Sequence, residues 1–138
     1  LTEADRELVE AAKEMALESY APYSKFHVGA AIRMADGSIE RGSNQENVAF
    51  SSGICAERTA AWHASAVKPG MRMCKIAIAA ATDGVFQPTP ISPCGASRQA
   101  LVEYETLHGP MEVILYGSKE IYRVPSMPSL LPLTFTEF

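Results

Sequence analysis

The sequence predicts an α/β protein with a three-layer α/β/α architecture and a mixed central sheet. Segments with helical spacing of apolar residues alternate with short runs of strand length, and Asp36-Gly37 is a hairpin turn signal between two such runs. Residues 74–82, CKIAIAAAT, form a continuous apolar run typical of a central strand covered on both faces. A chain of 138 residues can bury its own core, so we expect a single domain over residues 1–138.

The first expected element is a helix over about residues 3–19, which Pro22 follows. Its apolar residues recur at helical spacing with charges between them: Leu8, Ala11, Ala12, Met15, Ala16 and Leu17. The next segment, FHVGAAIRMADGSIERGSN, predicts two strands joined by the Asp36-Gly37 turn.

Two further helices are each expected to begin at a cysteine, over about residues 55–67 and from Cys94 to the residue before Gly109-Pro110. MEVILYG predicts another strand, IYRVPS an edge strand, and the apolar, proline-broken end SLLPLTFTEF a packed tail without a long helix. Residues 82–91 are expected to form a surface loop, with pocket lining as the alternative.

Composition and charge exclude several classes of protein. A net charge of −4 and a pI near 5.4 argue against a polyanion-binding surface, so we expect no nucleic-acid partner. No stretch reaches the roughly 18 consecutive apolar residues of a membrane span, and the charged N-terminal segment has no signal-peptide core. An odd number of cysteines, three, favours a reducing compartment, and we expect the cytoplasm and no membrane partner.

Two short segments carry candidate chemistry: Cys55-Ala56-Glu57-Arg58 and Pro93-Cys94-Gly95-Ala96-Ser97, each at an expected helix start. A cysteine there feels the positive end of the helix dipole, which favours the zinc-binding thiolate. A glutamate two residues after Cys55 could move protons beside a metal-bound water. Taken singly, such a cysteine is more often a small buried hydrophobe and such a glutamate a surface charge. The joint pattern is that of zinc nucleobase deaminases.

The sequence resembles the small homotetrameric cytidine deaminases over nearly its whole length. Five blocks occur in that family's order: SYAPYSKFHVGAA (19–31), NQEN (44–47), GICAERTA (53–60), PCGASRQ (93–99) and LLPLTF (130–135). The resemblance implies the family's α/β/α fold, a Zn²⁺ cofactor, a nucleoside substrate and a homotetramer with shared active sites.

The resemblance also implies roles for individual residues. Cys55 and Cys94 would be zinc thiolates, with residue 97 at the third ligand position, and Glu57 would shuttle protons to the pyrimidine N3 and the 4-amino group. Asn44 and Glu46 would hydrogen-bond the ribose 3′-hydroxyl. Three residues would contact or support these groups: Phe26 packs near the base, the Ala56 backbone meets the base edge, and Arg58 donates to the cysteine sulfurs. Phe135 would close over the base in a neighbouring subunit's site.

Two residues depart from the family pattern. Phe50 stands where tyrosine is expected, which removes a hydroxyl that would support the site. Ser97 replaces the third cysteine, and a seryl hydroxyl is a poor zinc ligand unless ionised, so the position could instead hold a water. With two thiolates and a neutral third ligand we expect weaker zinc retention but a more acidic metal-bound water.

Three histidines and the remaining cysteine are the other candidate ligands. His63 lies about two helical turns beyond Cys55, which is too far. His27 is expected to line the pocket or lie on the surface, with zinc ligation as the alternative. His108 is expected to end a helix and Cys74 to lie in the core.

The sequence is compatible with two functions. The first is zinc-dependent hydrolytic deamination of cytidine or 2′-deoxycytidine to the uridine product in pyrimidine salvage, indicated by Glu57 and both cysteines. The second is a nucleoside-binding pseudoenzyme that lost its metal, indicated by Ser97, although a deliberate Cys-to-Ser substitution would leave the same residue. A deaminase of a modified nucleoside would share the chemistry of the first.

Overall fold

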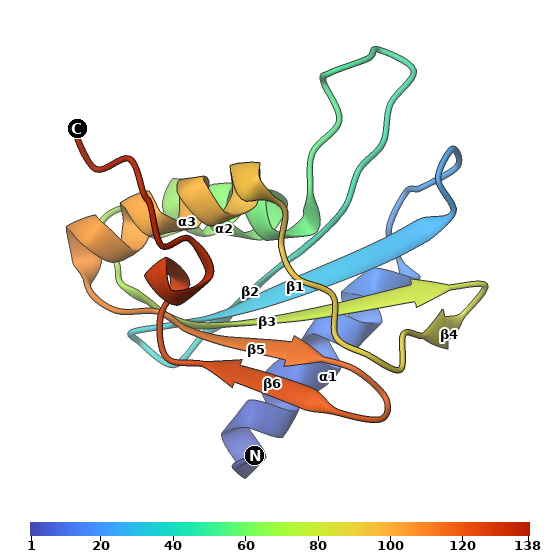
Figure 1. Ribbon diagram of the computed structural model, residues 1–138, viewed down its shortest axis with the longest axis horizontal. Coiled ribbons are helices and arrows are strands. Elements are labelled where there is room, and N and C mark those ends of the chain that lie inside the picture. The colour runs from blue at the N-terminus through green and yellow to red at the C-terminus, as the bar shows by residue number, and fades with distance from the viewer.

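The computed structural model describes residues 1–138 and contains three α-helices, six strands and one short 3₁₀ helix (Figure 1). In chain order the elements are α1 (Glu3–Leu17), β1 (Phe26–Met34), β2 (Ile39–Ser43), α2 (Ala56–Val67), β3 (Met73–Thr82), β4 (Val85–Phe86), α3 (Gly95–His108), β5 (Glu112–Tyr116), β6 (Ile121–Val124) and η1 (Met127–Leu130).

The six strands form one mixed sheet in the order β2-β1-β3-β5-β6, with β4 paired to β3. β3 and β5 are parallel, and the other neighbouring pairs are antiparallel. The hairpin between β1 and β2 turns at Gly37, whose φ of 88° lies in the left-handed region that glycine adopts without steric cost. The predicted hairpin, central strand and edge strand are therefore confirmed.

Helices cover both faces of this sheet. α1 packs on one face and α2 and α3 lie on the other (Figure 1). β3 shows why: Ile76 and Ile78 belong to the core under α2 and α3, whereas Ala77 and Ala79 belong to the core under α1. This alternation is what a strand buried on both faces produces. The predicted three-layer α/β/α fold with a mixed sheet is confirmed.

Glycines let two helices approach the sheet closely. A Cβ at Gly29 would lie 2.0 Å from the carbonyl oxygen of Ala12 in α1, and a Cβ at Gly42 would lie 2.3 Å from the backbone nitrogen of Ala60 in α2. No side chain fits at either position, so each glycine sets the distance between its strand and the helix. Gly42 thereby positions α2, whose first turn carries the candidate chemistry.

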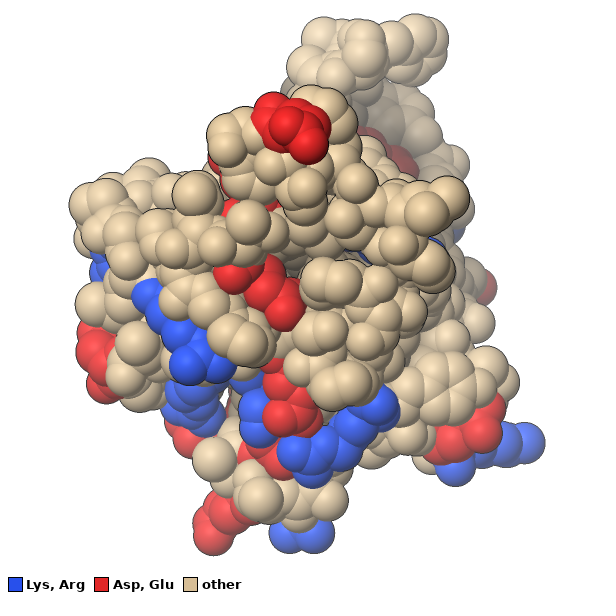
Figure 2. All heavy atoms as spheres, turned by 60° about the vertical axis from the view of Figure 1, so that its left-hand side comes forward, with Lys and Arg blue, Asp and Glu red and all other residues tan.

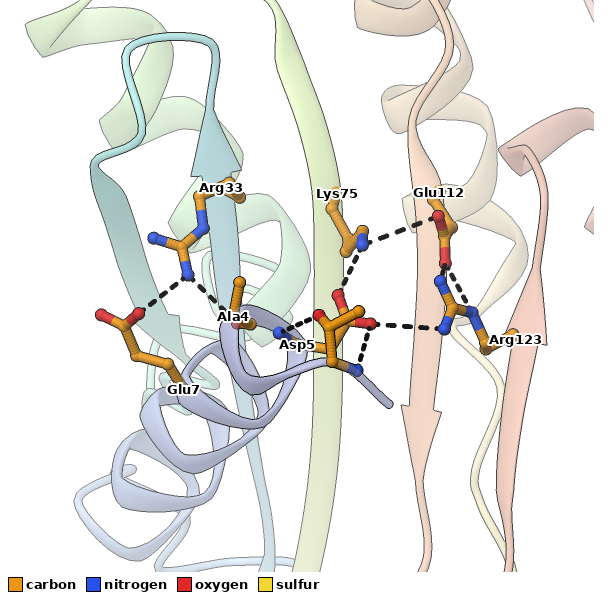
Figure 3. A network of polar contacts seen from close by, with 8 residues as sticks. Ala4, Asp5, Glu7, Arg33, Lys75, Glu112 and Arg123 are labelled. Carbon is orange, nitrogen blue, oxygen red and sulfur yellow. Dashed lines mark hydrogen bonds and ion pairs between the residues drawn. The ribbon is translucent and has the colours of Figure 1, made fainter.

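A buried carboxylate joins the start of α1 to the sheet (Figure 3). The Asp5 side chain accepts hydrogen bonds from the Thr2 backbone, Lys75 of β3 and Arg123 of β6 at 3.2, 2.5 and 3.3 Å. The Thr2 hydroxyl in turn accepts from the Asp5 backbone, which completes a capping box at the first turn of α1. One carboxylate therefore fixes three elements together.

The structure differs from the sequence predictions in a few places. α1 ends at Leu17, two residues before the predicted end. Cys74, expected in the core, is only half-buried at the start of β3, so that prediction is wrong. Residues 82–91 were expected to be a plain loop, but they contain β4, a two-residue strand too short to give a periodic signal.

The charged side chains are of both signs. On the face in Figure 2, acidic and basic residues are interspersed over the lower half, and the upper half shows mainly uncharged side chains with a few acidic ones. None of the three helices is both long enough and apolar enough to cross a membrane.

Candidate functional site

A pocket of about 300 Å³ opens on the sheet face that carries α2 and α3. It lies where the beginning of β1, the end of β2, the start of α2 and the segment before α3 meet. The lining residues are Ser24, Phe26, Val28, Asn44, Glu46, Cys55, Ala56, Glu57, Ile91, Ser92 and Cys94. Most of the residues proposed from sequence thus surround one cavity, although they come from four separate segments.

Two cysteines face each other beside this pocket. Cys55 is the N-cap of α2 and Cys94 the N-cap of α3, and their Sγ atoms are 3.7 Å apart. Two thiolates that share one tetrahedral zinc at Zn–S distances of about 2.3 Å would be separated by about 3.8 Å. The observed spacing therefore fits a shared zinc ion.

Ser97 and Arg58 complete this cluster. Ser97 is fully buried, and its Oγ lies 3.6 Å from the Cys94 Sγ. The Arg58 guanidinium donates from Nη2 to the Cys55 Sγ at 3.1 Å and from Nε to the Ser97 Oγ at 3.3 Å. No group of three or more His, Cys, Asp or Glu side chains is placed to hold a metal. The donor set is two thiols and one hydroxyl, and the spacing of the two thiols fits zinc.

The two thiols differ in their electrostatic surroundings. Burial raises the pKa of Cys55 above its ordinary value, although the hydrogen bond from Arg58 opposes this effect. Burial also acts to raise the pKa of Cys94, but the backbone N–H and the hydroxyl of Ser97 outweigh it, and the pKa of Cys94 falls. Cys94 is therefore the thiol more readily ionised before a metal binds.

The other candidate ligands lie elsewhere. His27 Nδ1 is 2.6 Å from the Ser19 Oγ, beyond the end of α1, and His27 does not line the pocket. The alternative that His27 ligates zinc is therefore wrong. His63 pairs with Glu40 at 3.3 Å, and His108 lies in the last turn of α3, as expected.

Glu57 lies in the first turn of α2, lines the pocket and is only 3% exposed. Burial raises the pKa of its carboxyl, and the opposing effects come from its own backbone and from Arg58. Burial without a strong cationic partner favours a carboxyl that can hold a proton. Ala56, the preceding residue, is fully buried and contributes backbone to the cavity wall.

Asn44 and Glu46 also line the pocket, and both are already hydrogen-bonded within the chain. The Asn44 side chain accepts from the Val28 backbone at 2.8 Å and donates to the Phe26 carbonyl at 2.9 Å. The Glu46 carboxylate accepts from the Ser24 hydroxyl and backbone. These bonds, with the Ser24 hydroxyl the largest cause, lower the pKa of Glu46. Both side chains are therefore fixed in position with capacity for a further partner.

Phe135 and Phe50 lie outside this chain's own pocket. Phe135 is 60% exposed, and its backbone forms two hydrogen bonds with the Gln99 side chain, at 2.7 and 3.0 Å. Phe50 is 88% exposed in the long loop between β2 and α2 that protrudes in Figure 1.

Four lining residues were not proposed from sequence: Ser24, Val28, Ile91 and Ser92. Ser24 and Val28 lie two residues before and two residues after Phe26 in the sequence, and this proximity is the only sequence feature that could have identified them as lining residues. Ile91 ends the 82–91 segment, so the pocket-lining alternative holds for that residue.

Comparison with known proteins agrees with this geometry. The family profile described as "Cytidine and deoxycytidylate deaminase zinc-binding region" matches residues 2–111. A cytidine deaminase of Sporosarcina psychrophila is 41% identical over 131 residues, covering 94% of this chain and 90% of that protein. A probable cytidine deaminase of Dictyostelium discoideum is 36% identical over 129 residues, covering 94% and 82% of the two chains.

A solved structure shows the same fold. The cytidine deaminase from Burkholderia pseudomallei superposes with a TM-score of 0.81 at 39% sequence identity, covering 98% of this chain and 100% of that one. The profile match spans both cysteine segments and Glu57, the residues that the structure brings together. This chain belongs to the zinc-binding cytidine and deoxycytidylate deaminase family.

Proposed function

We propose that this protein catalyses the hydrolytic deamination of cytidine and 2′-deoxycytidine to uridine and 2′-deoxyuridine. The observation that carries the proposal is the buried carboxyl of Glu57, which lines the same pocket as the paired thiols of Cys55 and Cys94. The names of its relatives, cytidine deaminases, support the same reaction.

In this reaction water adds at C4 of the pyrimidine, the 4-amino group leaves as ammonia, and a carbonyl remains at C4. Cys55 and Cys94, with Ser97 beside them, would hold the zinc ion, which when bound acidifies water so that it is a nucleophile at neutral pH. Glu57 supplies the proton transfers. Its carboxylate accepts a proton from the attacking water and passes it to N3 of the ring. It then accepts the remaining proton from the new hydroxyl at C4 and delivers it to the departing amine, which leaves as ammonia.

The remaining lining residues bind and orient the nucleoside. Phe26 packs against the core and presents an aromatic side chain to the base. Asn44 and Glu46, held by their internal hydrogen bonds, offer polar atoms to the ribose hydroxyls. Because those bonds already fix both side chains, substrate binding loses little of their conformational freedom.

A homotetramer with shared active sites is part of the proposal. The exposed aromatics Phe135 and Phe50 and the nearby Leu133, 94% exposed, are apolar side chains that a neighbouring subunit would cover. Phe135 would then reach the base in a neighbouring pocket. Pyrimidine salvage in the cytoplasm is the corresponding cellular role.

The test is a deaminase assay of zinc-loaded protein, which follows ammonia release and the ultraviolet change from cytidine to uridine. We expect turnover of cytidine or 2′-deoxycytidine, and a fall in kcat of roughly 100- to 10,000-fold in Glu57→Gln. If the protein turns over neither nucleoside but does deaminate a modified cytidine or an aminopurine nucleoside, that compound class would replace cytidine as the proposed substrate.

The second candidate function, a metal-free nucleoside-binding protein, is favoured by one observation: a hydroxyl, that of Ser97, stands where the resemblance implies a third thiol ligand. Cytidine binding by calorimetry without turnover of any of these nucleosides, in protein that retains no zinc, would support this function instead.

A further inference from the structure

Ser97, the residue beside the paired cysteines, bears directly on the ligand set of the metal site. We propose that the Ser97 Oγ is the third protein ligand of the zinc ion, so that the centre consists of two thiolates and one seryl oxygen. The competing arrangement has a water molecule at that position. The inference rests on the proposed zinc-dependent function, and it deepens the metal site of that function.

Two distances support this assignment. For tetrahedral zinc with Zn–S of about 2.3 Å and Zn–O of about 2.1 Å, we expect two sulfurs about 3.8 Å apart and a sulfur and an oxygen about 3.6 Å apart. The two Sγ atoms of Cys55 and Cys94 are 3.7 Å apart. The Cys94 Sγ and the Ser97 Oγ are 3.6 Å apart. The distances from the Cys94 Sγ to the Cys55 Sγ and to the Ser97 Oγ therefore both match those expected between two ligands of one tetrahedral zinc ion.

The burial of Ser97 favours the seryl oxygen over a water molecule as the third ligand. Ser97 has no exposed surface, although Cys94, three residues earlier, is exposed to the pocket. A water at the third position would need space between the Ser97 hydroxyl and the metal, in a packed region. The hydroxyl itself already occupies that region, 3.6 Å from the Cys94 Sγ, which is the spacing expected between two ligands of one zinc ion.

Arg58 holds this oxygen together with one of the sulfurs. Its Nε donates to the Ser97 Oγ at 3.3 Å and its Nη2 donates to the Cys55 Sγ at 3.1 Å. Because the guanidinium is planar and rigid, these two donors fix the separation of a thiol and a hydroxyl before metal binding. A hydroxyl oxygen has two lone pairs, so one remains for the metal when Arg58 occupies the other.

The local helix geometry gives the same result. Cys94 is the N-cap of α3 and Ser97 is the third residue of the helix. The side chain of an N-cap residue lies over the third helical residue, which is the basis of capping boxes. The two side chains therefore lie on the same side of the first turn of α3, with the Cys94 Sγ and the Ser97 Oγ 3.6 Å apart.

The experiment compares zinc binding in wild-type protein, Ser97→Ala, Ser97→Cys and the control Ser65→Ala, which removes a hydroxyl on α2 outside the pocket. Zinc per chain is measured by elemental analysis after purification without chelators, and affinity by competition with a chromogenic chelator. We expect Ser97→Ala to bind zinc at least about 10-fold more weakly than wild type, Ser97→Cys to bind more tightly, and Ser65→Ala to match wild type. Equal affinity in Ser97→Ala and wild type would overturn the assignment.

X-ray absorption at the zinc edge gives a second measurement that does not depend on the alanine variant folding. The sulfur count is expected to be two in wild type and three in Ser97→Cys, and a count of two in both would exclude residue 97 from the coordination sphere. These readouts are independent of turnover. If Ser97→Ala binds zinc more weakly but the wild-type protein deaminates no nucleoside, this inference holds and the proposed function is rejected. If the wild-type protein is active and Ser97→Ala binds zinc with unchanged affinity, the proposed function holds and this inference is rejected.

Discussion

The substitution Asp5→Asn tests the carboxylate that joins α1 to the sheet (Figure 3). Asp5 is 1% exposed and is paired with Lys75 and Arg123. Burial acts to raise the pKa of this carboxyl, but hydrogen bonds from Lys75 and Thr2 outweigh it and lower the pKa from 3.8 to about 2. Asparagine keeps one oxygen that can accept from the Thr2 backbone. It removes the charge and replaces the oxygen that accepts from Lys75 with an NH2 group, which donates.

The magnitude follows from that pKa. At about 1.36 kcal/mol per pKa unit, the fall to about 2 corresponds to about 2 kcal/mol of unfolding free energy. Arg123 is about half exposed, with 47% of its side chain accessible, so solvent screening reduces its share. We therefore expect Asp5→Asn to lose about 1–2 kcal/mol at pH 7.

The pH dependence has a defined sign. The carboxylate is more acidic in the folded protein than in the unfolded chain, so its contribution is complete above pH 3.8 and is lost as pH falls towards about 2. The stability gap between wild type and Asp5→Asn should accordingly be constant near neutral pH and close between pH 4 and pH 2.

Urea denaturation followed by circular dichroism, at pH 7, 5, 4 and 3 and at one fixed protein concentration, measures this gap. The matched control is Glu7→Gln. The Glu7 side chain is 64% exposed, and its carboxylate lies 3.2 Å from Arg33. We expect this control to change the unfolding free energy by less than about 1 kcal/mol. A gap for Asp5→Asn that is absent at pH 7, or that stays the same down to pH 3, would refute the reasoning.

Three other substitutions test the fold and the pocket. Gly42→Ala would bring a Cβ to 2.3 Å from the Ala60 backbone, so we expect the unfolding free energy to fall by about 1–3 kcal/mol; an unchanged thermal midpoint would contradict this close packing. Glu46→Gln removes the charge that Ser24 binds, and we expect KM for cytidine to rise about 10-fold with a smaller change in kcat; steady-state kinetics with an unaltered KM would remove Glu46 from the ribose site. Phe135→Ala truncates a side chain that is 60% exposed, so stability of the subunit should persist while kcat/KM falls about 2- to 10-fold; full activity would exclude a contact with the base.

The regular elements were predictable because their signals are local. The uninterrupted apolar run of β3 and the turn at Gly37 each depend on a few adjacent residues, and both were recovered. β4 was missed because two residues cannot show a period, and its pairing with β3 is a tertiary contact. Cys74 was misplaced because an apolar run gives no indication of where the sheet ends and solvent begins.

In the candidate site, too, features with a local sequence signal were predictable and features that depend on tertiary contacts were not. The helix starts at Cys55 and Cys94 could be read from sequence, since each follows a non-helical segment and precedes helix formers. The internal hydrogen bonds of Asn44, in contrast, were not predictable. They depend on β1 and β2 meeting in one register, and Asn44 makes them because it extends the β2 edge past the last ladder pair.

The third zinc ligand shows how sheet geometry settles a question that motif spacing leaves open. His27 lies between Phe26 and Val28, and side chains alternate between faces along a strand. Phe26 and Val28 line the pocket, so His27 must point to the opposite face, where it meets Ser19. No rotamer of His27 reverses that direction, because a change of face requires a one-residue slip of β1 against both of its neighbours. The candidate ligands therefore lie at the starts of α2 and α3, where Glu57 is the proposed proton carrier and Ser97 the proposed third ligand.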